Sequence, residues 1–390
     1  MSVTSPDGSR TIEPEEGPGA SFFRKLTTAT DWKSGVVIPA LAVFTALVIG
    51  AIIIMLTGSS FQQMLEAYKA LLIGSVGSLR AISATLTEAT PLILTGLCAA
   101  IGFRAGLFNI GGEGQLYIGG MCAVIAGFSF TGLPMVIHLP IAVIAGILGG
   151  AAWGFIPGFL KARTGAHEVI VTIMLNYISY RLVDYMLKTS FIQREGRNDP
   201  ISKSIEESAQ LPALLKWLDP AMKVHLGFFL ALGAAVFVWW LLFRTNTGFE
   251  FRAVGANPSA ARYAGMSVGK VYILVMVIAG GLAGLAGAGQ TLGVLYRGSP
   301  FFSAGLGFDG LAVALLGRSN PFGVVAAALL FGGLNAGGQY MQATADVGID
   351  LISVIQALII IFVAAPALIS AIYRVKTDAS ATQISQGWGS

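Results

Sequence analysis

The sequence predicts an all-α, polytopic membrane protein of about ten transmembrane helices, with a five-plus-five inverted repeat as a working hypothesis. The chain is 55% hydrophobic and only 11% charged, whereas soluble domains carry about 25% charged residues. Several runs contain no charge and approach the roughly 20 residues that a spanning helix needs. Two glycine-rich interruptions also fall at corresponding places in the two halves of the chain.

The strongest spans are charge-free stretches, which lie at 36–57, 226–243, 271–296, 319–345 and 351–373. The stretch 114–160 also lacks Lys, Arg, Asp and Glu, and its length fits two spans separated by the turn signal Gly132-Leu133-Pro134. Three weaker spans complete the set, at about 80–103, 167–188 and 304–317. One membrane domain, residues 36–373, is therefore expected.

The N-terminal segment 1–35 is expected to be cytoplasmic and disordered, and not a cleavable signal. The apolar run that follows it is too long for a signal h-region, and no small-residue cleavage pattern follows. Residues 1–20 are rich in Pro, Gly and Glu, which predicts disorder. A short tail, 374–390, closes the chain.

Basic residues predict the orientation, because cytoplasmic loops carry an excess of Lys and Arg. With ten spans, four basic clusters fall on the cytoplasmic side and both termini are cytoplasmic. The long loop 189–223 has five basic and five acidic residues and falls outside. The clusters are Arg24, Lys25 and Lys33; Lys161 and Arg163; Arg244, Arg252, Arg262 and Lys270; and Arg374 and Lys376.

The first interruption reads FRAGLFNIGGEGQLYIGG (103–120) and the second RGSPFFSAGLGFDG (297–310), and each carries one acid, Glu113 or Asp309. Dense glycine indicates a broken helix or a close approach of backbones. Halves with an odd number of spans have opposite topologies, and paired breaks in inverted halves point to a transport path. The sequence thus predicts a translocation path near these breaks.

The candidate path residues are polar groups in or beside spans: Asn109, Glu113, Gln115, Asn176, Asp309 and Asn335. Amide groups both donate and accept, which suits a neutral, hydroxyl-bearing solute better than an ion. The competing interpretation is interhelical hydrogen bonding, worth roughly 0.6 kcal/mol per bond. For Glu113, pairing with Arg104 or with glycine N–H groups stays as open as contact with a solute.

Recognisable catalytic chemistry is missing from the sequence. There is no GxxxxGK[ST] phosphate loop, and the nearest sequence, ending at Gly269-Lys270-Val271, lacks the Ser or Thr that holds magnesium. His138, His167 and His225 are scattered, so no metal site is expected. Cys98 and Cys122 fit packing roles. We therefore expect a non-enzymatic protein without catalytic residues, metal or cofactor, and any ATP would be bound by a partner.

The basic loop 244–270 contains a short predicted helix. Asn257 is an N-cap acceptor followed by Pro258 at the first helical position. Residues 258–264 provide about two turns, and Gly265 is a stop signal. A short helix in a cytoplasmic loop favours partner docking, although a solvated connector has the same features.

Three stretches carry a family resemblance: AVGANPSAARYAGM in this loop, PLILTGLCAAIGFRAGLFNIGGEGQLYIGG from Pro91, and GFDGLAVALLGRSNPFG from Gly307. They resemble ATP-binding cassette (ABC) importer permeases of the simple-sugar and branched-chain amino acid group. The stretch from Pro91 is most similar to nucleoside permeases that depend on a basic-membrane-protein-type lipoprotein. Together the stretches extend over predicted spans two to nine.

The resemblance implies a permease subunit in a bacterial-type inner membrane, surrounded by lipid, with a nucleoside or simple sugar as its small-molecule substrate. The implied partners are a second homologous permease, a cytoplasmic two-cassette ATPase and an external lipoprotein or periplasmic binding protein, with no nucleic acid polymer. It also makes the loop a coupling helix that contacts the ATPase through Arg252, Gly255, Asn257, Pro258, Ala260, Ala261, Arg262 and Gly265.

The alternative function is a secondary transporter coupled to protons or sodium through Glu113 or Asp309. The segment 1–35 and the loop 189–223 carry no motif that assigns them a role.

Overall fold

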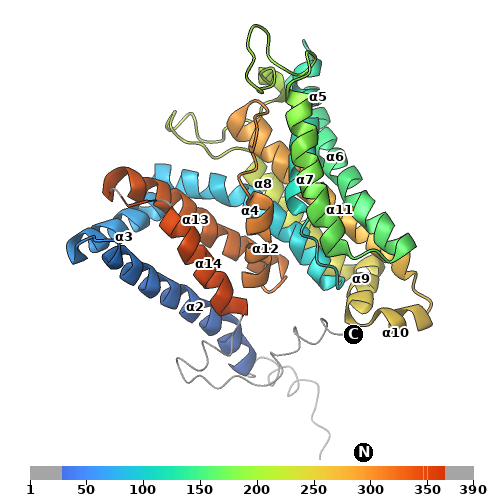
Figure 1. The fold of residues 1–390 in the computed structure, drawn as a ribbon, viewed down its shortest axis with the longest axis horizontal. Coiled ribbons are helices and arrows are strands. Elements are labelled where there is room, and N and C mark those ends of the chain that lie inside the picture. The colour runs from blue at the N-terminus through green and yellow to red at the C-terminus, as the bar shows by residue number, and fades with distance from the viewer. Residues whose placement is uncertain (1–28, 346, 349, 365–390) are drawn as a thin grey trace, which may run out of the picture.

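The computed structural model describes residues 29–345, 347–348 and 350–364, and within them the fold is entirely helical (Figure 1). Only two isolated β-bridges occur there, both in the loop before α8. The helices are α2 (Ala29–Leu56), α3 (Phe61–Val76), α4 (Leu79–Arg104), α5 (Gly112–Ser129), α6 (Met135–Thr164), α7 (Glu168–Leu187), a 3₁₀ turn η1 (Glu207–Ala209), α8 (Gly227–Arg244), α9 (Asn246–Ala256), α10 (Pro258–Tyr263), α11 (Val268–Gln290) continued by a π-helical turn η2 (Thr291–Leu295), α12 (Leu306–Leu316), α13 (Pro321–Ala345) and α14 (Asp350–Ala364).

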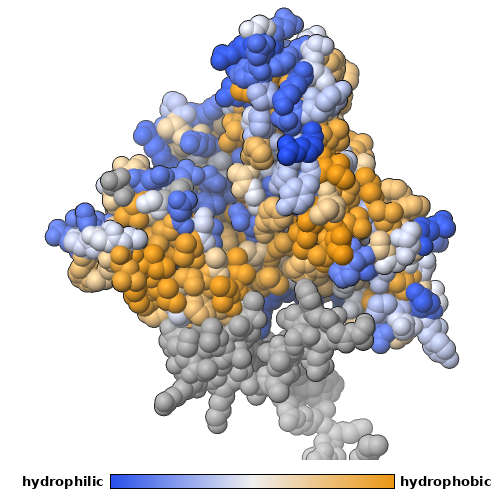
Figure 2. All heavy atoms as spheres, viewed as in Figure 1, coloured by the Kyte–Doolittle hydropathy of each residue, from blue (hydrophilic) through white to orange (hydrophobic). Residues whose placement is uncertain are grey.

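Five helices in the described part of the chain are long and apolar enough to cross a membrane: α4, α6, α8, α11 with η2, and α13. Shorter apolar helices occur at Ala40–Leu56, Leu306–Leu316 and Asp350–Val363. Hydrophobic residues cover much of the surface in Figure 2, whereas hydrophilic residues gather over the loops at one end and beside α9 and α10. The predicted all-α, multi-pass class is confirmed, and the count of ten spans stays a prediction.

Two helices were not predicted. α3 has polar residues in its first half, so it does not form a charge-free run, although its capping box was a readable signal: Ser60 N–H donates to Gln63 Oε1 at 2.8 Å, and Gln63 N–H to Ser60 Oγ at 3.2 Å. α9 was missed within the loop 244–270, where Thr245 Oγ1 accepts from Gly248 N–H at 3.0 Å and caps the helix.

Several helix ends also differ from the predicted spans. α2 begins at Ala29, inside the segment 1–35 expected to be disordered, and α6 continues to Thr164 past its charge-free run. A charge-free run marks only the part of a helix suited to lipid, and helices extend beyond it into water. The predicted last span reaches residue 373, and residues 365–373, 374–390 and 1–28 lie outside the described part.

The α6–α11 pair makes the most extensive contact in the structure. Glycines let the two backbones touch: a Cβ at Gly150 would lie 2.2 Å from the Gly280 carbonyl oxygen, and one at Gly284 would lie 2.2 Å from that of Gly146. The glycines of these two helices therefore pack against each other within one chain. Gly337 of α13 packs in the same way against Leu71 of α3.

α4 is the central helix: 83% of its most apolar stretch is buried, whereas only 22% of the corresponding stretch of α6 is buried. α4 contacts α11, α12 and α13, while α11 contacts α4, α5 and α6. In Figure 1, α2, α3, α13 and α14 form one side of the molecule, and α5, α6, α7 and α11 form the other.

The loop between α7 and α8 folds back over one end of the bundle. Ser83 Oγ of α4 accepts the N–H groups of Lys223 and Val224, each at 2.9 Å. Arg80 of α4 forms an ion pair with Asp219, and this hydrogen-bonded guanidinium holds the pKa of the Asp219 carboxyl below its usual value. This loop and the α9–α10 segment lie at opposite ends of the molecule (Figure 1).

We predict that Gly284→Ala lowers the apparent melting temperature of the purified protein. The added methyl group would meet the α6 backbone, and overpacking of this kind costs about 1–3 kcal/mol. The matched control is Gly233→Ala on α8, because a Cβ there meets nothing within 4 Å. Equal melting temperatures for the two variants would contradict this account of the α6–α11 contact.

Candidate functional site

The first break, residues 105–111, joins α4 to α5 as predicted. Its amide side chains bind each other: Asn109 Nδ2 donates to Gln115 Oε1 at 3.0 Å, and Gln115 Nε2 donates to Asn109 Oδ1 at 3.3 Å. Asn109 Oδ1 also accepts from Gly111 N–H at 3.0 Å. Both side chains are buried, so they stabilise the break from inside.

Asn176 of α7 fastens the first break to the neighbouring helix. Its Oδ1 accepts from Gly114 N–H at 2.9 Å, and its Nδ2 donates to the Ile110 carbonyl oxygen at 3.0 Å. Gly114 lies in the first turn of α5, whose N–H groups lack partners within the helix. Asn176 therefore acts as a cap supplied by another helix.

The second break, residues 296–305, leads from η2 to α12. Tyr296, Phe301 and Ala304 have positive φ angles of 55°, 54° and 47°, and Gly305 has φ 86°. Such conformations are uncommon for residues other than glycine and persist where surrounding contacts hold them. One such contact is the Phe301 N–H, which donates to Tyr117 Oη at 2.7 Å.

Glu113 joins the two breaks. Its carboxylate accepts hydrogen bonds from Tyr180 Oη at 3.2 Å, from Gly307 N–H at 2.7 Å and, through a short contact, from Ser303 Oγ. The side chain is 1% exposed. Gly307 lies in the first turn of α12, where a helix terminus favours negative charge. A Cβ at Gly307 would lie 2.2 Å from the Glu113 nitrogen, so the starts of α5 and α12 touch.

This geometry decides what Glu113 binds. In the described residues no cation pairs with it; Arg104 instead donates to the Ser319 and Arg318 carbonyl oxygens at 3.0 and 3.4 Å. The partners are two hydroxyls and one glycine N–H, and that glycine belongs to the opposite half of the chain. The pattern is a buried link between helices.

The six predicted path residues separate into groups. Asn109, Glu113, Gln115 and Asn176 meet at the breaks, and all four are buried. Asp309 is half-buried on α12, two residues after Gly307. Asn335 lies on α13 and accepts from Gln356 Nε2 of α14 at 2.8 Å, outside this network.

The predicted short helix is present as α10. Asn257 Oδ1 accepts from Ala260 N–H at 2.9 Å, with Pro258 as the first helical residue. At its end, Gly265 has φ 85° and donates to the Arg262 carbonyl oxygen, while Met266 N–H donates to that of Ala261, both at 3.0 Å. This pair of bonds is a Schellman motif.

α10 presents a defined outer surface. Asn257, Pro258, Ala260, Arg262 and Gly265 are exposed, and Ala261 is buried at 4% and anchors the helix. Sequence reasoning missed Tyr263, which is 98% exposed. The helical period could have indicated this exposure, because in a two-turn helix whose buried side is at Ala261 the residues next to it in sequence point outward.

Gly255 and Arg252 of α9 face the bundle instead. A Cβ at Gly255 would lie 2.3 Å from the Arg104 carbonyl oxygen, and one at Gly106 would lie 3.2 Å from the Gly255 Cα. The Arg252 guanidinium lies 5.4 Å from the centre of the Phe243 ring of α8. α9 therefore touches the start of the first break directly.

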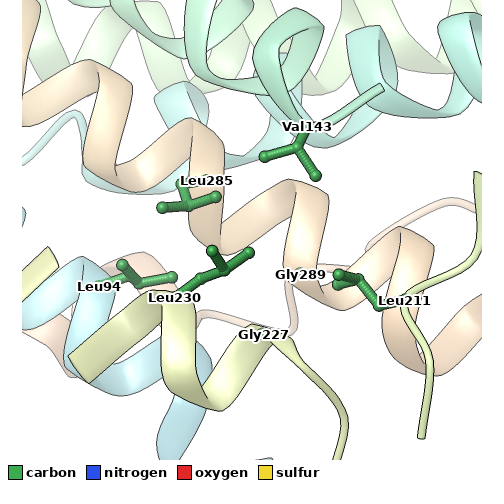
Figure 3. A pocket seen from close by; sticks show the side chains of 7 residues that line it. All are labelled: Leu94, Val143, Leu211, Gly227, Leu230, Leu285 and Gly289. Atoms are coloured by element: carbon green, nitrogen blue, oxygen red, sulfur yellow. The ribbon is translucent and has the colours of Figure 1, made fainter. Parts of the chain in front are cut away.

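Two cavities near α8 are lined entirely by apolar residues. One is a small gap among α4, α6, α8 and α11 beneath the folded-back loop (Figure 3). The other is a groove of about 420 Å³ along α6, α8 and α11. Neither offers hydrogen-bonding groups to a polar solute.

Comparison with known families places this architecture. The family described as "Branched-chain amino acid transport system / permease component" matches residues 81–364, which include both breaks and the α9–α10 segment. The chain belongs to this family of ABC transporter permeases. It is thus a non-catalytic transport subunit, as predicted, and ABC permeases act with ATPase and substrate-binding partners. Membership decides against the secondary transporter coupled through Glu113 or Asp309.

Three relatives extend over most of this permease. The guanosine ABC transporter permease NupP of Bacillus subtilis is 43% identical over 85% of this chain and 93% of its own length. The glucose ABC transporter permease TsgB13 of Haloferax volcanii is 33% identical over 83% and 86%. A second Bacillus subtilis guanosine permease, NupQ, is 29% identical over 64% and 79%.

We predict that Glu113→Ala destabilises the permease more than Glu113→Gln does. Alanine leaves three donors without their acceptor, at about 1–3 kcal/mol for each buried group, whereas glutamine keeps one acceptor oxygen. Apparent melting temperature in detergent is the measurement, with exposed Glu66→Ala of α3 as control. A Glu113→Ala variant as stable as wild type would contradict the role of Glu113 in holding the two breaks together.

Proposed function

We propose that this permease forms part of the membrane path of an ABC importer for a nucleoside, with a simple sugar as the second candidate. The observation that carries the proposal is the 43% identity to a guanosine permease over 85% of this chain and 93% of that relative. The sugar candidate has support in the identity to a glucose permease. Both are neutral, hydroxyl-bearing solutes.

Uptake measurements test the substrate. The complete importer is reconstituted in vesicles, and ATP-dependent uptake of labelled guanosine, ribose and glucose is measured separately. Uptake of guanosine that excess ribose or glucose does not reduce supports the nucleoside proposal, uptake of a labelled sugar without uptake of guanosine supports the second candidate, and uptake of none of the three would contradict both.

The proposed partners are a second homologous permease, a cytoplasmic two-cassette ATPase and an external lipoprotein or periplasmic binding protein. The presence of two guanosine permeases, NupP and NupQ, in one organism supports a permease pair.

We propose ten crossings in an inner membrane, with both termini cytoplasmic. Support comes from the opposite placement of the α7–α8 loop and the α9–α10 segment (Figure 1). α12 has 11 residues and is about 16 Å long, too short for a core of about 30 Å, so it would cross together with the second break.

The contacts of α4 with α12 and α13, and of α11 with α5 and α6, favour the inverted repeat. In such a repeat α4 corresponds to α11, α5 to α12 and α6 to α13. The contacts of α4 with α12 and α13 then correspond to the contacts of α11 with α5 and α6. The meeting of the two breaks at Glu113 also fits such a relation.

The proposed coupling runs from α10 to the breaks. ATPase closure displaces the exposed face of α10, and α9 carries the displacement to Gly255, which is in contact with the start of the first break. Glu113 then links the first break to the second, so both move together. The outward residues of α10 bind the ATPase, and Gly255 transmits the displacement of α9 to the first break.

We predict that Arg262→Glu, or Ala260→Trp, abolishes uptake while the protein still inserts and folds, because both residues lie on the exposed face of α10. Uptake and substrate-stimulated ATPase activity are measured in vesicles, with Arg163→Glu in the last turn of α6 as a matched charge control. Normal stimulation of the ATPase in both α10 variants would refute the docking role.

We predict that Gly255→Ala reduces substrate-stimulated ATPase activity without preventing assembly with the ATPase. The methyl group would lie 2.3 Å from the Arg104 carbonyl oxygen and push α9 away from the first break. Co-purification reports assembly, and Ala256→Ser on exposed α9 surface is the control. Loss of co-purification instead would make Gly255 a docking residue.

A further inference from the structure

One face of α7 carries groups that are unusual for a surface in contact with lipid. Tyr177, Arg181 and Tyr185 are four residues apart and so share one side of the helix. The two tyrosines are 63% and 69% exposed, and Arg181 is exposed as well. Because polar and charged groups within spans face protein or water rather than lipid, this face points to an aqueous path or a second chain.

Charge pairing does not neutralise this face. Asp184 of the same helix is bound by Lys188 at 2.7 Å, and no ion pair involves Arg181 among the residues described. An unpaired guanidinium beside exposed tyrosines requires water or polar groups of another chain around it.

The face continues onto the second break. The Tyr177 ring lies 6.5 Å from the Tyr180 ring, which lies 6.0 Å from the ring of Phe301. Phe301 is 72% exposed although its backbone has the unfavourable φ of 54°. The bond from its N–H to Tyr117 Oη holds it in this conformation. A large ring held outward at the cost of backbone strain suggests a contact that the isolated subunit lacks.

This aromatic surface is fixed to the Glu113 link from behind. Tyr180 Oη donates to Glu113, and the Tyr117 ring packs between Tyr180 and Phe302, at 5.3 and 4.7 Å. On α12, Phe308 is 42% exposed. It directly follows Gly307, where the contact with Glu113 leaves no room for a side chain. Movement of either break therefore moves the exposed rings.

We propose that Tyr177, Tyr180 and Phe301, here named the aromatic strip, line the translocation path and stack on the base of a nucleoside. Aromatic faces stack on any nucleobase, so the strip would hold the flat ring without fixing which base it is. Arg181 borders the strip and can donate to carbonyl groups of the base. This inference rests on the proposed nucleoside import and assigns substrate contact to the exposed rings, while the buried amides hold the breaks.

Uptake by variants tests the strip in the complete importer reconstituted in vesicles. Phe301→Leu keeps an apolar side chain but removes the ring, and we expect roughly tenfold slower guanosine uptake, in line with the loss of one base–aromatic stack. Phe301→Tyr restores uptake. The control is Phe322→Leu, which removes an exposed ring, 52%, on α13. The amount of assembled complex is measured for all three variants, so that a change in uptake is separated from a change in assembly.

Water access tests the same surface independently. Tyr177→Cys is expected to react with a membrane-impermeant maleimide, and guanosine is expected to slow that reaction. The control Ile144→Cys, on the exposed apolar surface of α6, is expected to stay unreactive. Unaltered protein gives the background reaction of Cys98 and Cys122.

The outcomes are separable. If the unaltered importer takes up no nucleoside, the proposed function fails. If it takes up guanosine and Phe301→Leu does so at the same rate, or if Tyr177→Cys is unreactive, the strip is not part of the path.

Discussion

The contact between the two breaks depends on one buried carboxylate, that of Glu113. Glu113 is in the first turn of α5, yet its acceptors are used by α7, by the second break and by α12. A carboxylate inside an apolar bundle is costly, and here charge-assisted hydrogen bonds and the start of α12 offset that cost. Two interrupted segments, 190 residues apart in sequence, thereby become one structural unit.

Glycine makes this unit compact. Gly307 lets the start of α12 touch the start of α5, Gly114 leaves room for the Asn176 cap, and Gly255 lets α9 reach the end of α4. Each position brings two backbones, or a backbone and a cap, closer than a Cβ allows. The glycines of the breaks are thus contact points between segments, and the α9 contact gives the exposed α10 surface a short connection to them.

Sequence reasoning predicted the helical class, most of the long apolar helices, both breaks and the α10 cap. These depend on local signals: charge-free length, glycine density, and an Asn-Pro start with a Gly stop. It missed α3 and α9, whose mixed polarity hides them from a search for charge-free runs. It identified Asn109, Glu113, Gln115 and Asn176 as a set, but could not determine that they are buried and bind one another.

The sequence by itself determined that this protein is a multi-pass helical permease with two interrupted helices and a short capped helix in a basic loop, because composition, spacing and motif are properties of the chain alone. The tertiary structure decided the partners of Glu113, the inward placement of Gly255 and Arg252, and the outward placement of Tyr177 and Phe301. Those outcomes depend on how segments far apart in sequence approach each other, and a hydrogen bond across about 190 residues leaves no periodic or local trace in the sequence.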